Sequence, residues 1–158
     1  MLYSLLKTLH LLAIVAWVGG MAFMTLCLRP AVATLAPSVR LPLLRSVLDR
    51  FFNVVLVASV LSLVTGFSMA GRAARQGVQA GGSFTMPLSW TVMAVLGVVM
   101  LAIFGHIRFA LFKRLSRAVD AEDWPAGGAA MAGLRPWVLI NLLIGLIVIA
   151  VAVIGGAR

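Results

Sequence analysis

The amino-acid sequence predicts an all-α, integral membrane four-helix bundle. Of its 158 residues, 63% are hydrophobic, whereas only about half of the residues of a soluble domain are apolar. Charged residues make up 11%, and the mean hydropathy is +1.12. A helix needs about 20 mainly apolar residues to cross a hydrocarbon core of roughly 30 Å. Four windows are long enough, and they fill most of the chain, so we expect a single transmembrane domain over 1–158 with spans at residues 5–28, 51–69, 88–112 and 136–154.

The first span begins near the N-terminus, where Lys7 precedes an apolar stretch as in a secretory signal. The stretch is longer than such a signal, and no small-residue cleavage site follows it. We therefore expect a helix that is retained. A connector with Pro37 and Pro42 follows, and apolar residues return at helical spacing from Pro42, so the second span is expected to begin as an amphipathic helix on the membrane surface.

The remaining elements are predicted from turn and capping signals. Residues 71–83 are rich in glycine and lack periodicity, which predicts an external loop. Thr85 as N-cap, with Pro87 just inside, should start the third helix. In the second helix, small residues recur at a spacing of four, which predicts a close helix contact: Ala58, Ser62 and Gly66.

The positive charges are distributed unevenly between the two sides of the predicted bundle. Nine of the 13 basic residues flank the first and third connections: Arg29, Arg40, Arg45, Arg50, Arg108, Lys113, Arg114, Arg117 and Arg135. The positive-inside rule puts those connections in the cytoplasm and both termini on the periplasmic side. We expect these basic residues to bind the anionic headgroups of the lipid bilayer. Nucleic acid is not an expected partner, because no nucleic-acid-binding motif is present.

One face of the first helix gathers its chemically unusual residues. At about 100° per residue, His10, Trp17, Met21 and Met24 fall near one line, which should point into the bundle. Imidazole and thioether donors suit copper, especially Cu(I). His10 lies about 16 Å from Met21 along the axis, so the two cannot share one ion. The alternative is structural: a neutral His10 bonded to a serine or a carbonyl, with methionines filling gaps.

The second histidine, His106, belongs to a deeper layer of the third helix than His10 does in the first. A haem held by both histidines is therefore not expected. His10 with Met69, near the outer end of the second helix, could instead hold haem b as a His/Met pair. His106 could also join Asn53 and Asn141 in a polar cluster near the inner face.

Several segments together resemble the CopD family, the copper resistance protein D domain of bacterial inner membranes. The most specific are His10 followed by Trp17-Val18-Gly19-Gly20, the Leu-Arg-Pro after the first helix, Thr65-Gly66, and Asn141 with Gly145. The resemblance implies a multi-pass inner-membrane protein that takes up or transfers copper from the periplasm, with a periplasmic copper-binding protein as a candidate partner. The opening around His10 and Trp17 also resembles the small membrane protoporphyrinogen oxidase family, which binds haem.

Three functional hypotheses result. The first is copper transfer through His10, Met21, Met24 and His106. The second is a b-type haem redox protein with His10 and Met69 as ligands. The third is a structural membrane subunit without a cofactor. No hydrolytic or nucleotide-binding motif is present, so the sequence weighs against an enzyme without deciding the question. A homo-oligomer is compatible with the sequence.

Overall fold

The computed structural model describes residues 1–156, and every element within that range is a helix. The helices join into four rods. The first comprises α1 (Leu2–Phe23), the π-helical turn η1 (Met24–Leu28) and α2 (Arg29–Ala31); the second is α3 (Pro37–Gln79); the third comprises α4 (Leu88–His106), the π-helical turn η2 (Ile107–Leu111) and α5 (Phe112–Asp120); the fourth is α6 (Trp124–Gly156). All four rods are long and apolar enough to cross a membrane, so the all-α four-helix prediction is confirmed.

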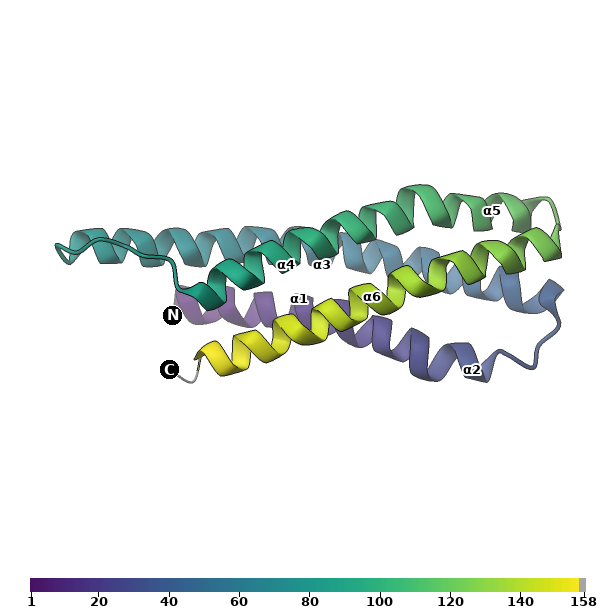
Figure 1. The fold of residues 1–158 in the computed structure, drawn as a ribbon, viewed down its shortest axis with the longest axis horizontal. Helices are drawn as coiled ribbons and strands as arrows, with labels where there is room; N and C mark the ends of the chain where they lie inside the picture. Colours follow the sequence, from purple (N-terminus) through teal and green to yellow (C-terminus); the bar gives the residue numbers. More distant parts are fainter. Residues whose placement is uncertain (157–158) are drawn as a thin grey trace.

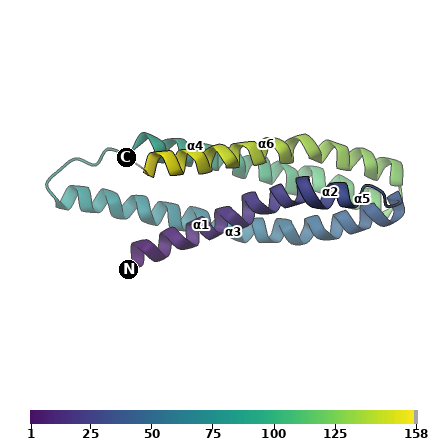
Figure 2. The ribbon, with the colours of Figure 1, turned by 90° about the horizontal axis from the view of Figure 1, so that it is seen from below.

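The four rods run side by side along the long axis of the molecule (Figure 1). Turning the view by 90° shows α1 lying along α3 and α4 lying along α6 (Figure 2). The chain enters and leaves the bundle at the same end, which we call the terminal end. The opposite end holds the connectors 32–36 and 121–123, and we call it the basic end because the nine basic residues named above lie in that half.

Only the end of the Gly-rich segment 71–83 forms the loop that its composition predicted, because residues 71–79 are helical. α3 continues through it to Gln79 and extends beyond both termini at the terminal end (Figure 1). Ala, Arg and Gln, which dominate this segment, are strong helix formers, and a glycine in a helix costs only about 1 kcal/mol. The chain turns back after the helix, where the Gly82 N–H donates to the Gly77 carbonyl at 3.1 Å.

The start of the third rod was also predicted wrongly. Pro87, not Thr85, is the N-cap, and α4 begins at Leu88 with no side-chain cap. The Pro87 carbonyl accepts the first hydrogen bond, from the Trp90 N–H at 2.9 Å. A proline disfavours helical backbone at the residue before it, so Met86 stays outside the helix and the cap moves past Thr85.

The basic half of the bundle is held together by aromatic rings. The ring of Phe52 in α3 lies edge-on to the rings of Phe104 and Phe112, at centroid distances of 5.9 Å and 5.1 Å. Trp17 of α1 contacts Phe104 in the same way, at 5.9 Å. Since edge-to-face pairs add to the stabilisation from burial, these rings join three of the rods.

Two ion pairs connect α3 to the third rod in the same half. Arg45 and Asp120 lie 2.5 Å apart, and Arg108 lies 3.3 Å from Asp49. Arg108 also stacks over the ring of Phe112, with its guanidinium carbon 5.2 Å from the ring centroid. Arg108 therefore combines an ion pair with a cation–π contact, whereas Arg45 has only its ion pair with Asp120 among these contacts.

Candidate functional site

His10 is fixed in the interface between α1 and α3. Its Nδ1 lies 3.0 Å from the carbonyl oxygen of Ser62 and 2.9 Å from Oγ1 of Thr65. Residue 66 of α3 is glycine, and a Cβ there would be in ordinary van der Waals contact with the ring, 3.4 Å from Cε1 of His10. The small-residue ridge in α3 thus makes the close contact that the sequence predicted, and it makes it around His10.

The partners of Nδ1 determine the tautomer of His10. The carbonyl of Ser62 can only accept a hydrogen bond. The hydroxyl of Thr65 lies 2.6 Å from the Leu61 carbonyl and donates its proton there, so towards His10 it also accepts. Nδ1 therefore carries the proton, and the lone pair of the neutral ring is on Nε2. An N–H of the ring bonded to a carbonyl is the arrangement that orients histidine ligands of metals through their other nitrogen.

The structural alternative for His10 predicted a hydrogen bond to a carbonyl, and the structure shows that bond. The same bond leaves Nε2 unprotonated, so its lone pair can bind a metal ion. The role of Thr65 was not anticipated. A signal was present, because Ser62, Thr65 and Met69 lie three and four residues apart and so share one helix face. Met69 is half-buried one turn beyond Thr65, and its pairing with His10 around haem stays a prediction.

Met21 lies deeper in the bundle than His10 and meets Asn141 of α6. The two side chains are 3% and 1% exposed, respectively. Nδ2 of Asn141 donates a hydrogen bond to the sulfur of Met21 at 3.8 Å. Oδ1 of Asn141 is fully buried and has no hydrogen-bond partner among the described residues. A buried amide oxygen without a partner is uncommon in native proteins and calls for an explanation.

A cavity of about 20 Å³ lies next to this pair, and we call it the central chamber. All four rods contribute to its wall. The lining residues are Trp17, Met21, Met24, Leu48, Phe51, Phe52, Val55, Phe104, Ile107, Val138 and Asn141. The inward face predicted for the first helix is thus observed from His10 to Met24, and two of its thioethers meet in one small apolar space.

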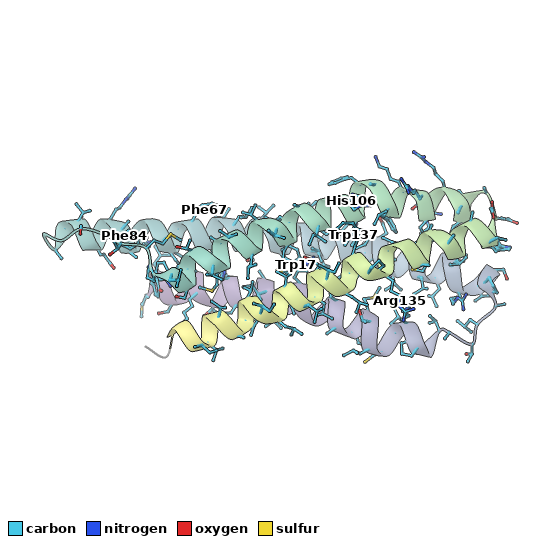
Figure 3. All side chains as sticks on the ribbon, in the orientation of Figure 1. Trp17, Phe67, Phe84, His106, Arg135 and Trp137 are labelled. Carbon is cyan, nitrogen blue, oxygen red and sulfur yellow. The ribbon has the colours of Figure 1, made fainter. Side chains whose placement is uncertain are left out.

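His106 lies outside this arrangement. Its side chain is exposed, and its ring packs on Trp137 of α6 at a centroid distance of 4.8 Å (Figure 3). Asn53 is exposed and Asn141 faces Met21, so the polar cluster of His106, Asn53 and Asn141 does not form. Six residues separate His106 from the buried Met100, which puts the two on different faces of the rod.

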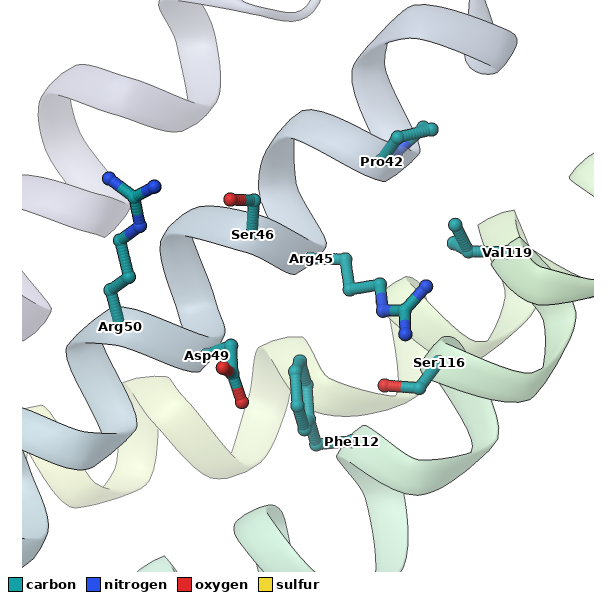
Figure 4. A pocket seen from close by; sticks show the side chains of 8 residues that line it. All are labelled: Pro42, Arg45, Ser46, Asp49, Arg50, Phe112, Ser116 and Val119. Atoms are coloured by element: carbon teal, nitrogen blue, oxygen red, sulfur yellow. The ribbon is translucent and has the colours of Figure 1, made fainter.

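A wider pocket of about 400 Å³ opens on the surface at the basic end (Figure 4). It is lined by Pro42, Arg45, Ser46, Asp49, Arg50, Phe112, Ser116 and Val119. Neither this pocket nor the central chamber is lined by His10 or Met69.

The donor chemistry of the described residues is soft. They contain no group of three or more His, Cys, Asp or Glu side chains that could hold a metal ion. Cys27, the single cysteine, is exposed in η1. The donors on the inward face are the buried thioether of Met21, the partly buried thioether of Met24 and the half-buried imidazole of His10, a set that fits Cu(I) better than a hard cation.

Comparison with known proteins gave one family. The family model described as copper resistance protein D matches residues 45–154, more than two thirds of the chain. The matched region begins within α3 and contains Ser62, Thr65 and Asn141, while α1 precedes it. No curated protein and no solved structure matched the chain.

Proposed function

Because the chain belongs to the copper resistance protein D family, we propose that this multi-pass membrane protein transfers copper across the bacterial inner membrane through donors on α1. The observation that supports the proposal most directly is the hydrogen bond from Nδ1 of His10 to the Ser62 carbonyl. It leaves the lone pair of Nε2 available to bind a metal ion. Copper is the cargo in this proposal, so each site must bind it reversibly.

The proposed path has an order that follows from the distribution of charge. The basic end faces the cytoplasm by the positive-inside rule, so the terminal end faces the periplasm. His10, about two helical turns from the start of α1, is then the outer acceptor. Met21 and Met24 follow about 16 to 21 Å further along the helix and are the ligands in the middle of the membrane.

His106 is the inner acceptor in this path. It lies next to Ile107, which lines the central chamber, but its own ring is on the outside of the bundle. An exposed ligand contributes least to a buried path. We therefore expect substitution of His106 to reduce transfer less than substitution of His10 or Met21.

Copper accumulation by cells expressing the full chain tests the proposal. The wild-type chain should raise the copper content of the cells, and His10→Ala and Met21→Leu should each remove most of the increase. Leucine has nearly the volume of methionine, so it removes the sulfur with little change in packing. Met86→Leu is the matched control, because Met86 is exposed in the connector before α4. Equal accumulation by all variants at equal expression would contradict the path.

A further inference from the structure

The central chamber contains a polar group that the proposed path does not use. Asn141 lines the chamber and is 1% exposed, and its Oδ1 has no partner among the described residues. Its amide is held in place by the hydrogen bond to the Met21 sulfur, so the side chain cannot turn its oxygen towards water without losing that bond. The orphan oxygen therefore stays on a side chain that lines the same chamber as Met21 and Met24.

The chamber has room for one small occupant. Its volume of about 20 Å³ exceeds the roughly 10 to 15 Å³ that a single water molecule needs. A buried water is stable when it makes two to four hydrogen bonds, and apart from Asn141 and the indole N–H of Trp17 the wall is formed by apolar side chains and two thioethers. Oδ1 of Asn141 is the one strong acceptor in this wall, so water is poorly accommodated.

A soft monovalent cation suits the same wall. Thioether sulfur has two lone pairs, and the amide hydrogen bond occupies one lone pair of Met21. The sulfur of Met24 and the Oδ1 of Asn141 provide two further donors, and the aromatic side chains of Trp17 and Phe52 belong to the same lining. No charged side chain lines the chamber, so a divalent ion would meet a much larger desolvation cost than a monovalent one.

We infer that Met21, Met24 and Oδ1 of Asn141 form a three-donor site for Cu(I), and for its analogue Ag(I), in the central chamber. This inference rests on the proposed function, which it deepens in two respects. It assigns Asn141 as a ligand, and it restricts the cargo at this depth to the cuprous oxidation state. The hydrogen bond from Nδ2 to Met21 gives Asn141 a second role, because it orients the thioether that shares the ion.

Silver titration of the purified full chain in detergent micelles tests this site. Ag(I) is stable in air, and binding beside Trp17 should quench part of the tryptophan fluorescence. The quenching component should disappear in Trp17→Phe, which separates it from the signal of the other three tryptophans. Zn(II) at the same concentration should leave the Trp17 component unchanged.

Asn141→Leu is the decisive variant. It removes both the oxygen and the orienting amide, and we expect the Ag(I) affinity of the Trp17 component to fall by at least about tenfold, the loss seen when even an indirect partner of a metal site is removed. Asn53→Leu is the matched control, because Asn53 is an exposed asparagine outside the chamber. The control should bind Ag(I) as the wild type does.

Thermal unfolding without metal separates a ligand role from a structural one. Asn141→Leu replaces a buried orphan polar group by an apolar one of similar size, so its unfolding temperature should equal or exceed that of the wild type. Stability retained together with weaker Ag(I) binding supports the site. Unchanged Ag(I) affinity in both Asn141→Leu and Met21→Leu would overturn it.

The outcomes also separate this site from the proposed function. If His10→Ala abolishes copper accumulation while the chamber variants bind Ag(I) normally, the transfer function stands and the three-donor site is wrong. If the chamber variants lose Ag(I) binding while none of the variants changes copper accumulation, the site stands and the transfer function is wrong.

Discussion

Nδ1 of His10 in α1 lies 2.9 Å from Oγ1 of Thr65 in α3, and both this oxygen and the nearby Ser62 carbonyl accept from the ring. The contact is compatible both with a structural role for His10 and with a role as a metal ligand. It satisfies a polar group inside an apolar bundle, and it leaves Nε2 as the unprotonated nitrogen. The chemistry available to His10 is therefore determined by the neighbouring helix.

Thr65→Val should weaken copper binding at His10 while preserving the bundle. Valine has the shape of threonine without the hydroxyl, so the ring keeps only the Ser62 carbonyl as partner and its orientation loosens. We expect the Cu(I) affinity of the His10 site to fall by roughly tenfold to a hundredfold. Competition with a chromogenic Cu(I) chelator measures this affinity. Thr91→Val, which removes an exposed hydroxyl, should leave it unchanged; a similar loss in both variants would contradict the role of Thr65.

Gly145→Ala should destabilise the bundle. A Cβ at this position would lie 2.8 Å from Cγ2 of Val18 and 3.2 Å from Cε of Met100, so α6 would have to move away from α1 and α4. Such overpacking costs about 1 to 3 kcal/mol. Gly97→Ala is the control, because a Cβ there meets no atom within 4 Å, and alanine favours a helix more than glycine does. Thermal unfolding in detergent should show a lower midpoint for the first variant and an equal or higher one for the second.

The two ion pairs of the basic half should differ in strength. Arg108→Gln removes the pair with Asp49 and the stacking on Phe112, and we expect it to cost about 1 to 2 kcal/mol. Arg45→Gln removes only an exposed pair with Asp120 and should cost less than about 1 kcal/mol. Denaturant unfolding of the two variants compares them. Equal losses would show that the aromatic contact of Arg108 contributes nothing.

The number of spanning helices follows from the sequence because the bilayer imposes it. A chain with four apolar windows must form four spanning helices to satisfy its backbone, and the inward face of α1 follows from the spacing of His10, Trp17 and Met21. The helical segment before Gln79 was missed because glycine lowers helix propensity without forbidding a helix. The cap was misplaced because the effect of Pro87 on the preceding residue outweighed the capping tendency of Thr85.

The sites were less predictable than the helices. A single sequence does not state which helix lies opposite His10, so the pairing with Ser62 and Thr65 could not be derived, and neither could the contact between Met21 and Asn141. The exposure of His106 was within reach, because its angle from Met100 puts it on another face, and Met100 is buried. The central chamber depends on four rods at once and required the three-dimensional structure.

The orientation of the bundle can be tested with cysteine labelling. In a Cys27→Ala background, Ser83→Cys places a thiol in the connector at the terminal end, and Ala121→Cys places one in a connector at the basic end. A membrane-impermeant thiol reagent added to cells with a permeabilised outer membrane should label the first and not the second, because the positive-inside rule puts the basic end in the cytoplasm. The reverse pattern would invert the proposed path.

The haem hypothesis has a direct optical test. Haem held by His10 and Met69 would give a Soret band in protein purified from haem-replete cells, and both His10→Ala and Met69→Leu would remove it. We expect a colourless preparation, because the proposed path uses His10 for copper. A Soret band lost in both variants would favour haem over copper.

The central claim is that donors on the inward face of α1 bind copper, and a Cu(I) titration of the purified full chain tests it most directly. The wild-type chain should bind Cu(I) at two separate positions, since about 16 Å divides His10 from Met21 along the helix. The double variant with His10→Ala and Met21→Leu should lose both, while Met86→Leu retains both. Cu(I) binding that is unchanged in the double variant would contradict the account.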